Sequence, residues 1–321
     1  MTEQHDTENR GYAQAPDQIP LPPAFPDASA FAEPPRERFS FRMIAIPLIG
    51  MLLHHLLLNL LALLGTVVYN TAYAIPAGMN IEEMARQSAP WVQAFASVAL
   101  LVTAVPLYIF YIRSRENVHP GHVLREPLNR TDKWIRILSY TGAALVLTQG
   151  LLFLLQELSK NIEFLEQAFN DYDEIIDLIA GTEVPFWFNF VALVIAAPIA
   201  EELLFRGIIM GEWMRTMPNW MNILFQGILF GLFHMNFLQT AYVIIPGLLL
   251  GAVYLRTKHI LAPILMHMLY NFCGGILPDL LQDSPHMLGA VLGVELLVAV
   301  FGFIYFFARR LLGRRAEERN G

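Results

Sequence analysis

The feature that most constrains this chain is the recurrence of apolar runs of about 20 residues, each long enough as a helix to cross ~30 Å of hydrocarbon. The chain is 321 residues long, 55% apolar and only 15% charged, whereas soluble domains carry about 25% charged residues. We therefore expect an all-α fold, a polytopic membrane helical bundle of about eight transmembrane helices. The predicted spans cover residues 43–69, 91–112, 134–156, 186–206, 219–235, 239–255, 259–277 and 287–308.

The distribution of basic residues predicts how these spans are oriented, because lysines and arginines gather in cytoplasmic loops. If the N-terminus is cytoplasmic and the chain crosses eight times, every lysine and arginine except Arg86 and Lys160 falls on the cytoplasmic side. We expect an integral protein of the cell inner or plasma membrane with both termini in the cytoplasm.

The two ends of the chain differ in composition from the bundle between them. Residues 1–35 are rich in proline, with scattered acids and no apolar period, so they cannot bury enough surface to fold. We predict a disordered cytoplasmic tail over 1–35, a helical bundle over 36–315, and a short polar tail over 316–321.

Outside the fourth to seventh runs, a few features stand out. Residues 157–185 contain apolar residues at steps of three and four, which predicts an amphipathic helix at the outer interface. Its role is either a connector packed on the bundle or a lid that screens substrates.

In the first span, His54, His55 and Asn59 are expected to face the bundle as packing residues rather than as ligands. In the last span, Glu295 should find a polar partner inside the bundle.

Two adjacent carboxylates and an arginine lie at the end of the fourth run. Each charge at a helix centre in lipid costs about 2.5–3.5 kcal/mol on insertion scales, so Glu201, Glu202 and Arg206 call for a reason. Pro198 should free the carbonyl of Val194, four residues back, and bend the helix. Glu202 and Arg206 can pair at i and i+4, while Glu201 points about 100° away. One acid can then be structural and the other chemical; the alternative is an ion-pair network that only pins helices.

Two later spans each carry a polar pair at helical spacing. Phe230 and His234 share a face of the fifth span, and His267 and Asn271 share a face of the seventh. A lone histidine in a membrane helix is usually a packing hydrogen bonder, but the three groups together supply a base, two imidazoles and an amide. The glycine pairs 227/231 and 247/251 allow neighbouring helices to approach closely.

Such a set of side chains can perform hydrolysis. A glutamate deprotonates water, a histidine orients it, and Asn271 and His267 donate to the developing oxyanion. A glutamate with two histidines is also a sufficient ligand set for catalytic zinc, with Glu201, His234 and His267 as the ligands. No HExxH motif occurs and no serine lies between residues 186 and 277, which argues against a rhomboid-like serine mechanism. The single cysteine, Cys273, excludes an internal disulfide.

The order and spacing of these motifs resemble the CAAX-protease and bacteriocin-processing (CPBP, or Abi) family of intramembrane proteases. The resemblance covers roughly residues 185–277 and rests on three motifs: Glu201-Glu202-x-x-x-Arg206, Phe230-x-x-x-His234 and His267-x-x-x-Asn271. It implies hydrolysis of a peptide bond in a cavity within the bilayer.

The resemblance also implies a role for each motif residue. Glu201 and His234 would activate water, His267 and Asn271 would stabilise the oxyanion, and Glu202 and Arg206 would be the supporting pair. The family is often described as metalloproteases, but the glutamate mechanism needs no metal, so we expect no cofactor and keep zinc as the alternative.

We therefore predict an intramembrane endopeptidase that cleaves a membrane-associated peptide or protein. Its surroundings are the lipid bilayer, and no nucleic acid is expected as a partner. The site is expected nearer the cytoplasmic leaflet, because the acids close a helix that runs inward. The rival hypothesis is a non-catalytic membrane protein, such as a bacteriocin-immunity or partner-binding scaffold or a small transporter, which uses the same side chains as a hydrogen-bonded core or proton path.

Overall fold

The computed structural model describes residues 38–115, 128, 131–179 and 184–320, which form one unit within residues 34–321. The predicted disordered tail, residues 1–35, lies outside the described residues. The elements in chain order are α1 (Arg42–Tyr69), η2 (Asn70–Ala74), α2 (Ile81–Ser114), α3 (Thr131–Ser159), α4 (Glu163–Ile179), α5 (Phe186–Phe190), η3 (Val191–Ala196), α6 (Ala197–Glu202), η4 (Leu203–Ile209), α7 (Met210–Trp213), α8 (Asn219–Leu232), α9 (Phe237–Thr257), α10 (Leu261–Asn271), η5 (Phe272–Ile276), α11 (Leu277–Leu281) and α12 (Pro285–Asn320), where η marks a π-helical segment.

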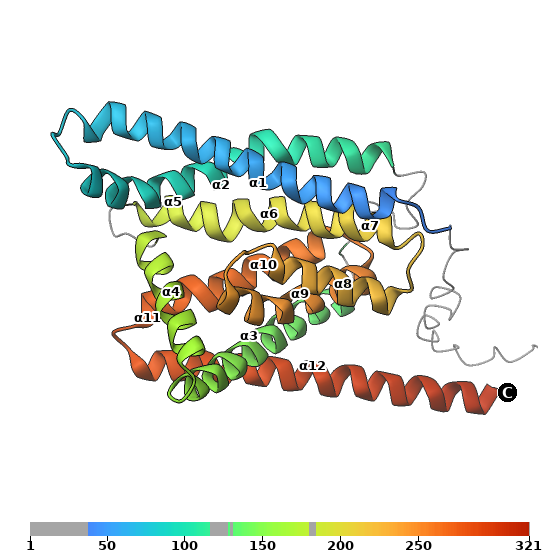
Figure 1. The fold of residues 1–321 in the computed structure, drawn as a ribbon. Helices are drawn as coiled ribbons and strands as arrows, with labels where there is room; N and C mark the ends of the chain where they lie inside the picture. Colours follow the sequence, from blue (N-terminus) through green and yellow to red (C-terminus); the bar gives the residue numbers. More distant parts are fainter. Residues whose placement is uncertain (1–37, 116–127, 129–130, 180–183, 321) are drawn as a thin grey trace, which may run out of the picture. The chain divides into compact units, whose positions relative to one another are not determined.

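Seven of the described helices are long and apolar enough to cross a membrane, which confirms an integral membrane protein built as a helical bundle. They cover Arg42–Ala74, Ile81–Ser114, Thr131–Ser159, Phe186–Trp213, Phe237–Thr257, Leu261–Leu281 and Pro285–Leu312. In Figure 1, α1 begins at the same end of this unit as that where α12 ends.

The predicted fifth span, 219–235, is shorter than the sequence suggested. Its helix α8 has 14 residues, or about 21 Å at 1.5 Å per residue, too short to cross ~30 Å of hydrocarbon alone. Pro218 precedes its first residue. Beyond Leu232 the chain turns, and Met235 takes a left-handed conformation with φ 56° that a right-handed helix cannot continue.

The helix from Phe186 to Trp213 is the most enclosed of the long helices. Half of its apolar window is buried inside the bundle, against 11% for the helix that begins at Arg42. Its central segment α6 packs against α2 on one side and α10 on the other, and Figure 1 shows it between these helices. Side chains carried by this helix are therefore sheltered from lipid by neighbours on several sides.

Helices α8 and α9 approach each other closely through glycines, as the two G-x-x-x-G patterns predicted. A Cβ atom at Gly247 would lie 3.1 Å from the carbonyl oxygen of Gly227 and 3.1 Å from the Phe230 ring. One at Gly231 would lie 2.8 Å from the carbonyl oxygen of Thr240. The small residues thus let one backbone touch the other, and the contact brings the α9 backbone next to the α8 motif.

The amphipathic helix predicted within 157–185 is α4, which packs on the bundle through aromatic contacts to α9. The rings of Phe164 and Phe237 meet edge to face with centroids 4.7 Å apart, and the hydroxyls of Tyr172 and Tyr242 lie 2.9 Å apart. Burial raises the pKa of the Tyr172 phenol, which keeps its proton available to this hydrogen bond. The helix α4 therefore packs on the bundle as a connector would, while the lid role stays a prediction.

The isolated polar residues of the outer helices find partners in most cases. Buried His54 meets the Tyr108 hydroxyl through its Nδ1 at 2.9 Å, and Gln149 donates to a carboxylate oxygen of Glu295 at 3.0 Å. Both predictions are confirmed. The expectation that Asn59 faces the bundle is wrong, because its side chain is exposed and donates to the carbonyl of His55 in its own helix.

Candidate active site

The centre of the candidate site is a fully buried ion pair on the helix between Phe186 and Trp213. Glu202 and Arg206, both completely shielded from solvent, are joined by Oε1 and Nη1 at 2.8 Å. The second terminal nitrogen of Arg206 donates to the carbonyl of Gly247 at 2.8 Å, and its guanidinium carbon lies 4.7 Å from the centroid of the Phe230 ring. The pairing predicted from the i, i+4 spacing is present and ties α6, η4, α8 and α9 together.

His267 joins the same carboxylate from α10. Its Nδ1 lies 2.9 Å from Oε1 of Glu202, and because an ionised carboxylate only accepts hydrogen bonds, Nδ1 carries the proton. The other ring nitrogen, Nε2, faces Oε2 of Glu201 at 3.9 Å. His267 therefore bridges the two adjacent acids, one through a hydrogen bond and the other across a longer gap.

The two neighbouring glutamates occupy different surroundings, as the 100° difference in direction predicted. Glu202 is completely buried and its Oε1 is shared by Arg206 and His267. The side chain of Glu201 keeps 16% of its surface exposed, and within the described part of the chain no hydrogen bond joins it to another residue. Glu202 is thus held by its partners, while Glu201 keeps part of its side chain exposed.

Asn271 is placed by the proline that precedes the acids. In the π-helical segment η3 the N–H of Ala197 donates to the carbonyl of Ala192, five residues back. In that register the carbonyl of Leu193 would take the next N–H, but residue 198 is proline and has none. Asn271 donates to this carbonyl instead, with Nδ2 and the oxygen 2.9 Å apart.

This contact corrects the prediction that Pro198 frees the carbonyl of Val194. The reason is the π-helical register, which shifts the affected oxygen by one residue. π-helical turns occur frequently at functional sites, and here two of them, η3 and η4, flank the segment that carries the acids. The amide of Asn271 has a second N–H, which the bond to Leu193 leaves available.

His234 lies just past the last residue of α8, in a turn, and not on the helix face that its spacing predicted. Its backbone N–H donates to the carbonyl of Gly231, and its Nδ1 lies 2.9 Å from the carbonyl oxygen of Phe230. Because a carbonyl only accepts, Nδ1 carries the proton and Nε2 is an acceptor in the neutral ring. The turn thus fixes the tautomer of His234.

The ring of Phe230 connects the polar side chains of the site. It meets His234 edge to face at 5.2 Å and His267 edge to face at 5.7 Å, centroid to centroid. No hydrogen bond or ion pair joins His234 directly to Glu201 among the described residues. The structure therefore brings Glu201, Glu202, Arg206 and His267 into one cluster, and places His234 beside it across Phe230.

Two supporting groups escaped the sequence analysis. The carbonyl of Gly247 accepts from Arg206 and also from Nε2 of Gln226, each at 2.8 Å. Gln226 is fully buried on α8, one turn before Phe230. Its polar side chain in an apolar run was an available signal, whereas a backbone carbonyl gives none.

The acids do not lie at the end of their helix. The predicted span ended at residue 206, but the helix continues to Trp213, because a further apolar stretch follows the charges. Glu201 is therefore near the middle of a 28-residue helix. The expectation of a site nearer the cytoplasmic leaflet relied on the earlier boundary and stays a prediction.

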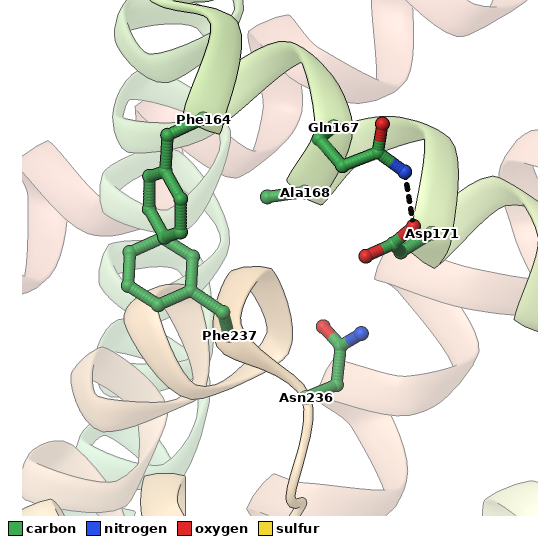
Figure 2. A pocket seen from close by; sticks show the side chains of 6 residues that line it. All are labelled: Phe164, Gln167, Ala168, Asp171, Asn236 and Phe237. Carbon is green, nitrogen blue, oxygen red and sulfur yellow. Dashed lines mark hydrogen bonds between the residues drawn. The ribbon is translucent and has the colours of Figure 1, made fainter.

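A pocket of about 100 Å³ lies between α4 and the beginning of α9 (Figure 2). It is lined by Phe164, Gln167, Ala168, Asp171, Asn236 and Phe237. Gln167 and Asp171 are hydrogen-bonded to each other in its wall. None of the lining residues is a predicted catalytic residue, although Asn236 follows His234 by two positions.

The zinc alternative was tested on the same side chains. Among the described residues no three histidine, cysteine, aspartate or glutamate side chains are grouped so that they could hold a metal ion. Glu201, His234 and His267 do not form such a group. Nδ1 of each histidine donates to an oxygen, so only Nε2 of each ring is left for a metal. We therefore derive no step through a metal.

Comparison with known proteins agrees with the motifs. Residues 183–273 match the family model of the type II CAAX prenyl endopeptidases, described as Rce1-like. No curated protein and no solved structure matches the chain. The match contains all three motifs, so it confirms the resemblance to CPBP proteases over the segment that carries them, and at the level of the family it supports a membrane endopeptidase.

Proposed function

We propose that this membrane protein, whose residues 183–273 match the type II CAAX prenyl endopeptidase family, hydrolyses a peptide bond of a membrane-associated peptide or protein with a water activated by Glu201. The observation that carries the proposal is the contrast between the two acids. Glu202 is buried and held by Arg206 and His267, while Glu201 is partly exposed and without a hydrogen bond among the described residues. A general base needs that access to water.

The reaction would start with proton transfer from water to the Glu201 carboxylate. The water oxygen attacks the peptide carbonyl carbon, and the electron pair of the C=O bond moves to its oxygen. His234 supports this step through Nε2, which the bond from Nδ1 to the Phe230 carbonyl leaves as an acceptor for a water proton. Collapse of the tetrahedral intermediate breaks the C–N bond, and the proton held by Glu201 passes to the leaving nitrogen.

The negative charge on the attacked oxygen needs donors already in place. Asn271 has one amide N–H anchored on the Leu193 carbonyl and a second that can donate to the oxyanion. His267 is oriented by Glu202, and with both ring nitrogens protonated it would donate from Nε2. Glu202 and Arg206 act through these groups: they fix the His267 ring and hold α9 through Gly247.

The non-catalytic rival predicts that the polar residues are paired off separately. Glu202, Arg206 and Gln226 do behave as a hydrogen-bonded core. A scaffold gives no reason, however, for an acid with no hydrogen bond of its own among the described residues beside an imidazole at 3.9 Å. This difference favours the endopeptidase.

The orientation in the membrane belongs to the same proposal. The positive-inside distribution of lysines and arginines supports cytoplasmic termini in the inner or plasma membrane. The shared end of α1 and α12 in Figure 1 fits this arrangement.

The test is cleavage of a membrane-peptide library that includes prenylated CAAX peptides, by purified wild type and Glu201→Gln in nanodiscs, each with and without a chelator. We expect wild type to cleave with and without chelator, and Glu201→Gln to lose cleavage while its melting temperature stays near that of wild type. Normal cleavage by Glu201→Gln would exclude this residue as the base, and loss of wild-type cleavage with chelator would restore the zinc mechanism.

A further inference from the structure

A third histidine reaches the site from outside the family match. His55 lies on α1, far from residues 183–273 in sequence, and its side chain is half-buried. Its ring packs on that of Phe233 with centroids 4.2 Å apart and planes inclined by 34°. Phe233 is the residue directly before His234, so α1 contacts the turn that carries the proposed water-orienting histidine.

The contact is polar as well as aromatic. The His55 ring lies within electrostatic range of the Phe233 backbone carbonyl, of Glu201 and of His234.

The preceding histidine shows what a purely structural residue looks like at this place. His54 is buried, its Nδ1 meets the Tyr108 hydroxyl at 2.9 Å, and it touches Phe233 edge to face at 5.2 Å. Its polar partner, Tyr108, is on α2. His55 packs on the same Phe233 ring at a shorter distance, 4.2 Å, and its electrostatic neighbours include Glu201 and His234.

We propose that His55 is a positioning residue of the Glu201–His234 pair, which holds the turn after α8 through Phe233 and keeps the His234 imidazole aligned with the acid. The expected change in kcat rests on the proposed function, whereas the positioning of the turn by His55 does not. This positioning assigns a role in the site to α1, a helix that the family match does not include.

The variant that separates polarity from packing is His55→Phe, which keeps an aromatic ring on Phe233 and removes both ring nitrogens. The matched control is Tyr108→Phe, which removes the polar partner of His54 on the same pair of helices. In nanodiscs we expect His55→Phe to lower kcat about tenfold with KM within about twofold, and Tyr108→Phe to change neither. His55→Asn and His55→Gln place an amide N–H near either ring position, and at least one should recover most of the kcat.

A second readout does not depend on cleavage. The rate at which diethyl pyrocarbonate modifies His234 is followed by mass spectrometry relative to exposed His286. We expect this ratio to change in His55→Phe and to stay at the wild-type value in Tyr108→Phe. If no peptide is cleaved by wild type but the ratio still changes, the proposed function fails while the positioning role stands. If His55→Phe matches Tyr108→Phe in kcat and in the His234 ratio, His55 is a packing residue and the inference is overturned.

Discussion

Two of the regions that bury a glutamate among apolar helices, around Glu295 and around Glu202, do so in different ways. On α12, Glu295 meets one neutral amide, Gln149 of α3. On α6, Glu202 shares one oxygen between a guanidinium and an imidazole, and the guanidinium continues to a backbone carbonyl. Both residues are nearly or fully buried, at 7% and 0% exposure.

The difference shows what each region can tolerate. A carboxylate with a single amide partner can be kept neutral, and its loss removes one hydrogen bond. A carboxylate in a network of charges cannot lose one member without stranding the others in a low-dielectric interior. The Glu202 network therefore holds four segments in fixed register, and beside it one further acid, Glu201, keeps 16% of its side chain exposed.

The largest expected effect on this comparison comes from Arg206→Ala. The substitution leaves the buried Glu202 carboxylate without its cationic partner. We expect it to lower the unfolding free energy by about 3–5 kcal/mol and to lower activity as well. Its counterpart is Arg136→Ala on α3, where the guanidinium carbon lies 4.3 Å from the centroid of the Phe306 ring and the loss should be about 1 kcal/mol. Denaturant unfolding in detergent measures both, and equal losses would remove the distinction between the regions.

The second-largest effect is expected at the side-chain amide of Asn271, which we compare with that of Gln149. Asn271→Ala should lower kcat about 100-fold, the usual cost of an oxyanion donor, and it also leaves the Leu193 carbonyl without its partner. Gln149→Ala removes an amide of similar burial from the Glu295 region and should leave kcat within about twofold of wild type. Steady-state cleavage in nanodiscs distinguishes them. A normal kcat for Asn271→Ala contradicts its assigned role.

A smaller effect is expected at the helix contact that supports Arg206. In Gly247→Ala the new Cβ meets the Gly227 carbonyl and the Phe230 ring at 3.1 Å each, so we expect a loss of about 1–3 kcal/mol from overpacking. Gly293→Ala on α12 has nothing within 4 Å of its new Cβ and should be neutral or slightly stabilising. A Gly247→Ala protein as stable as Gly293→Ala would show that the α8–α9 contact is loose.

Much of this arrangement was readable from the sequence because hydrocarbon thickness and the cost of membrane charge are strong constraints. Seven of the eight spans, the amphipathic helix, the Glu202–Arg206 pair and the glycine contacts follow from length, period and spacing. The i, i+4 rule identified the pair, but the rule assumes a regular α-helix. It failed where that assumption failed: at His234, which lies in a turn, and at Pro198, where π-helical register exposes Leu193 instead of Val194.

Other parts depend on contacts that no local pattern records. The Gly247 carbonyl becomes a ligand of Arg206 only because α8 and α9 pack at glycines. His55 and His54 are adjacent and look alike in sequence, yet the rotation of α1 places Nδ1 of His54 against the Tyr108 hydroxyl and packs the ring of His55 on Phe233 at 4.2 Å. Such differences arise from how helices distant in sequence face one another.

The smallest effect should follow from Glu295→Gln. The amide replaces a carboxyl that meets only Gln149 among its described hydrogen-bond partners, so unfolding free energy should change by less than about 1 kcal/mol and cleavage should stay within about twofold. Thermal unfolding in detergent checks the first expectation. A large loss would mean that the Glu295 region is also a charge network.

The account is tested most directly by single-turnover cleavage of one membrane-embedded peptide by Glu201→Gln and Glu295→Gln, side by side in the same nanodiscs. Each substitution replaces one glutamate carboxyl of a membrane helix by an amide of nearly the same size. We predict a rate at least about 1,000-fold below wild type for Glu201→Gln, within the range of lost general-base catalysis, and a wild-type rate for Glu295→Gln. Equal rates for the two variants would contradict the assignment of Glu201 as the group that activates water.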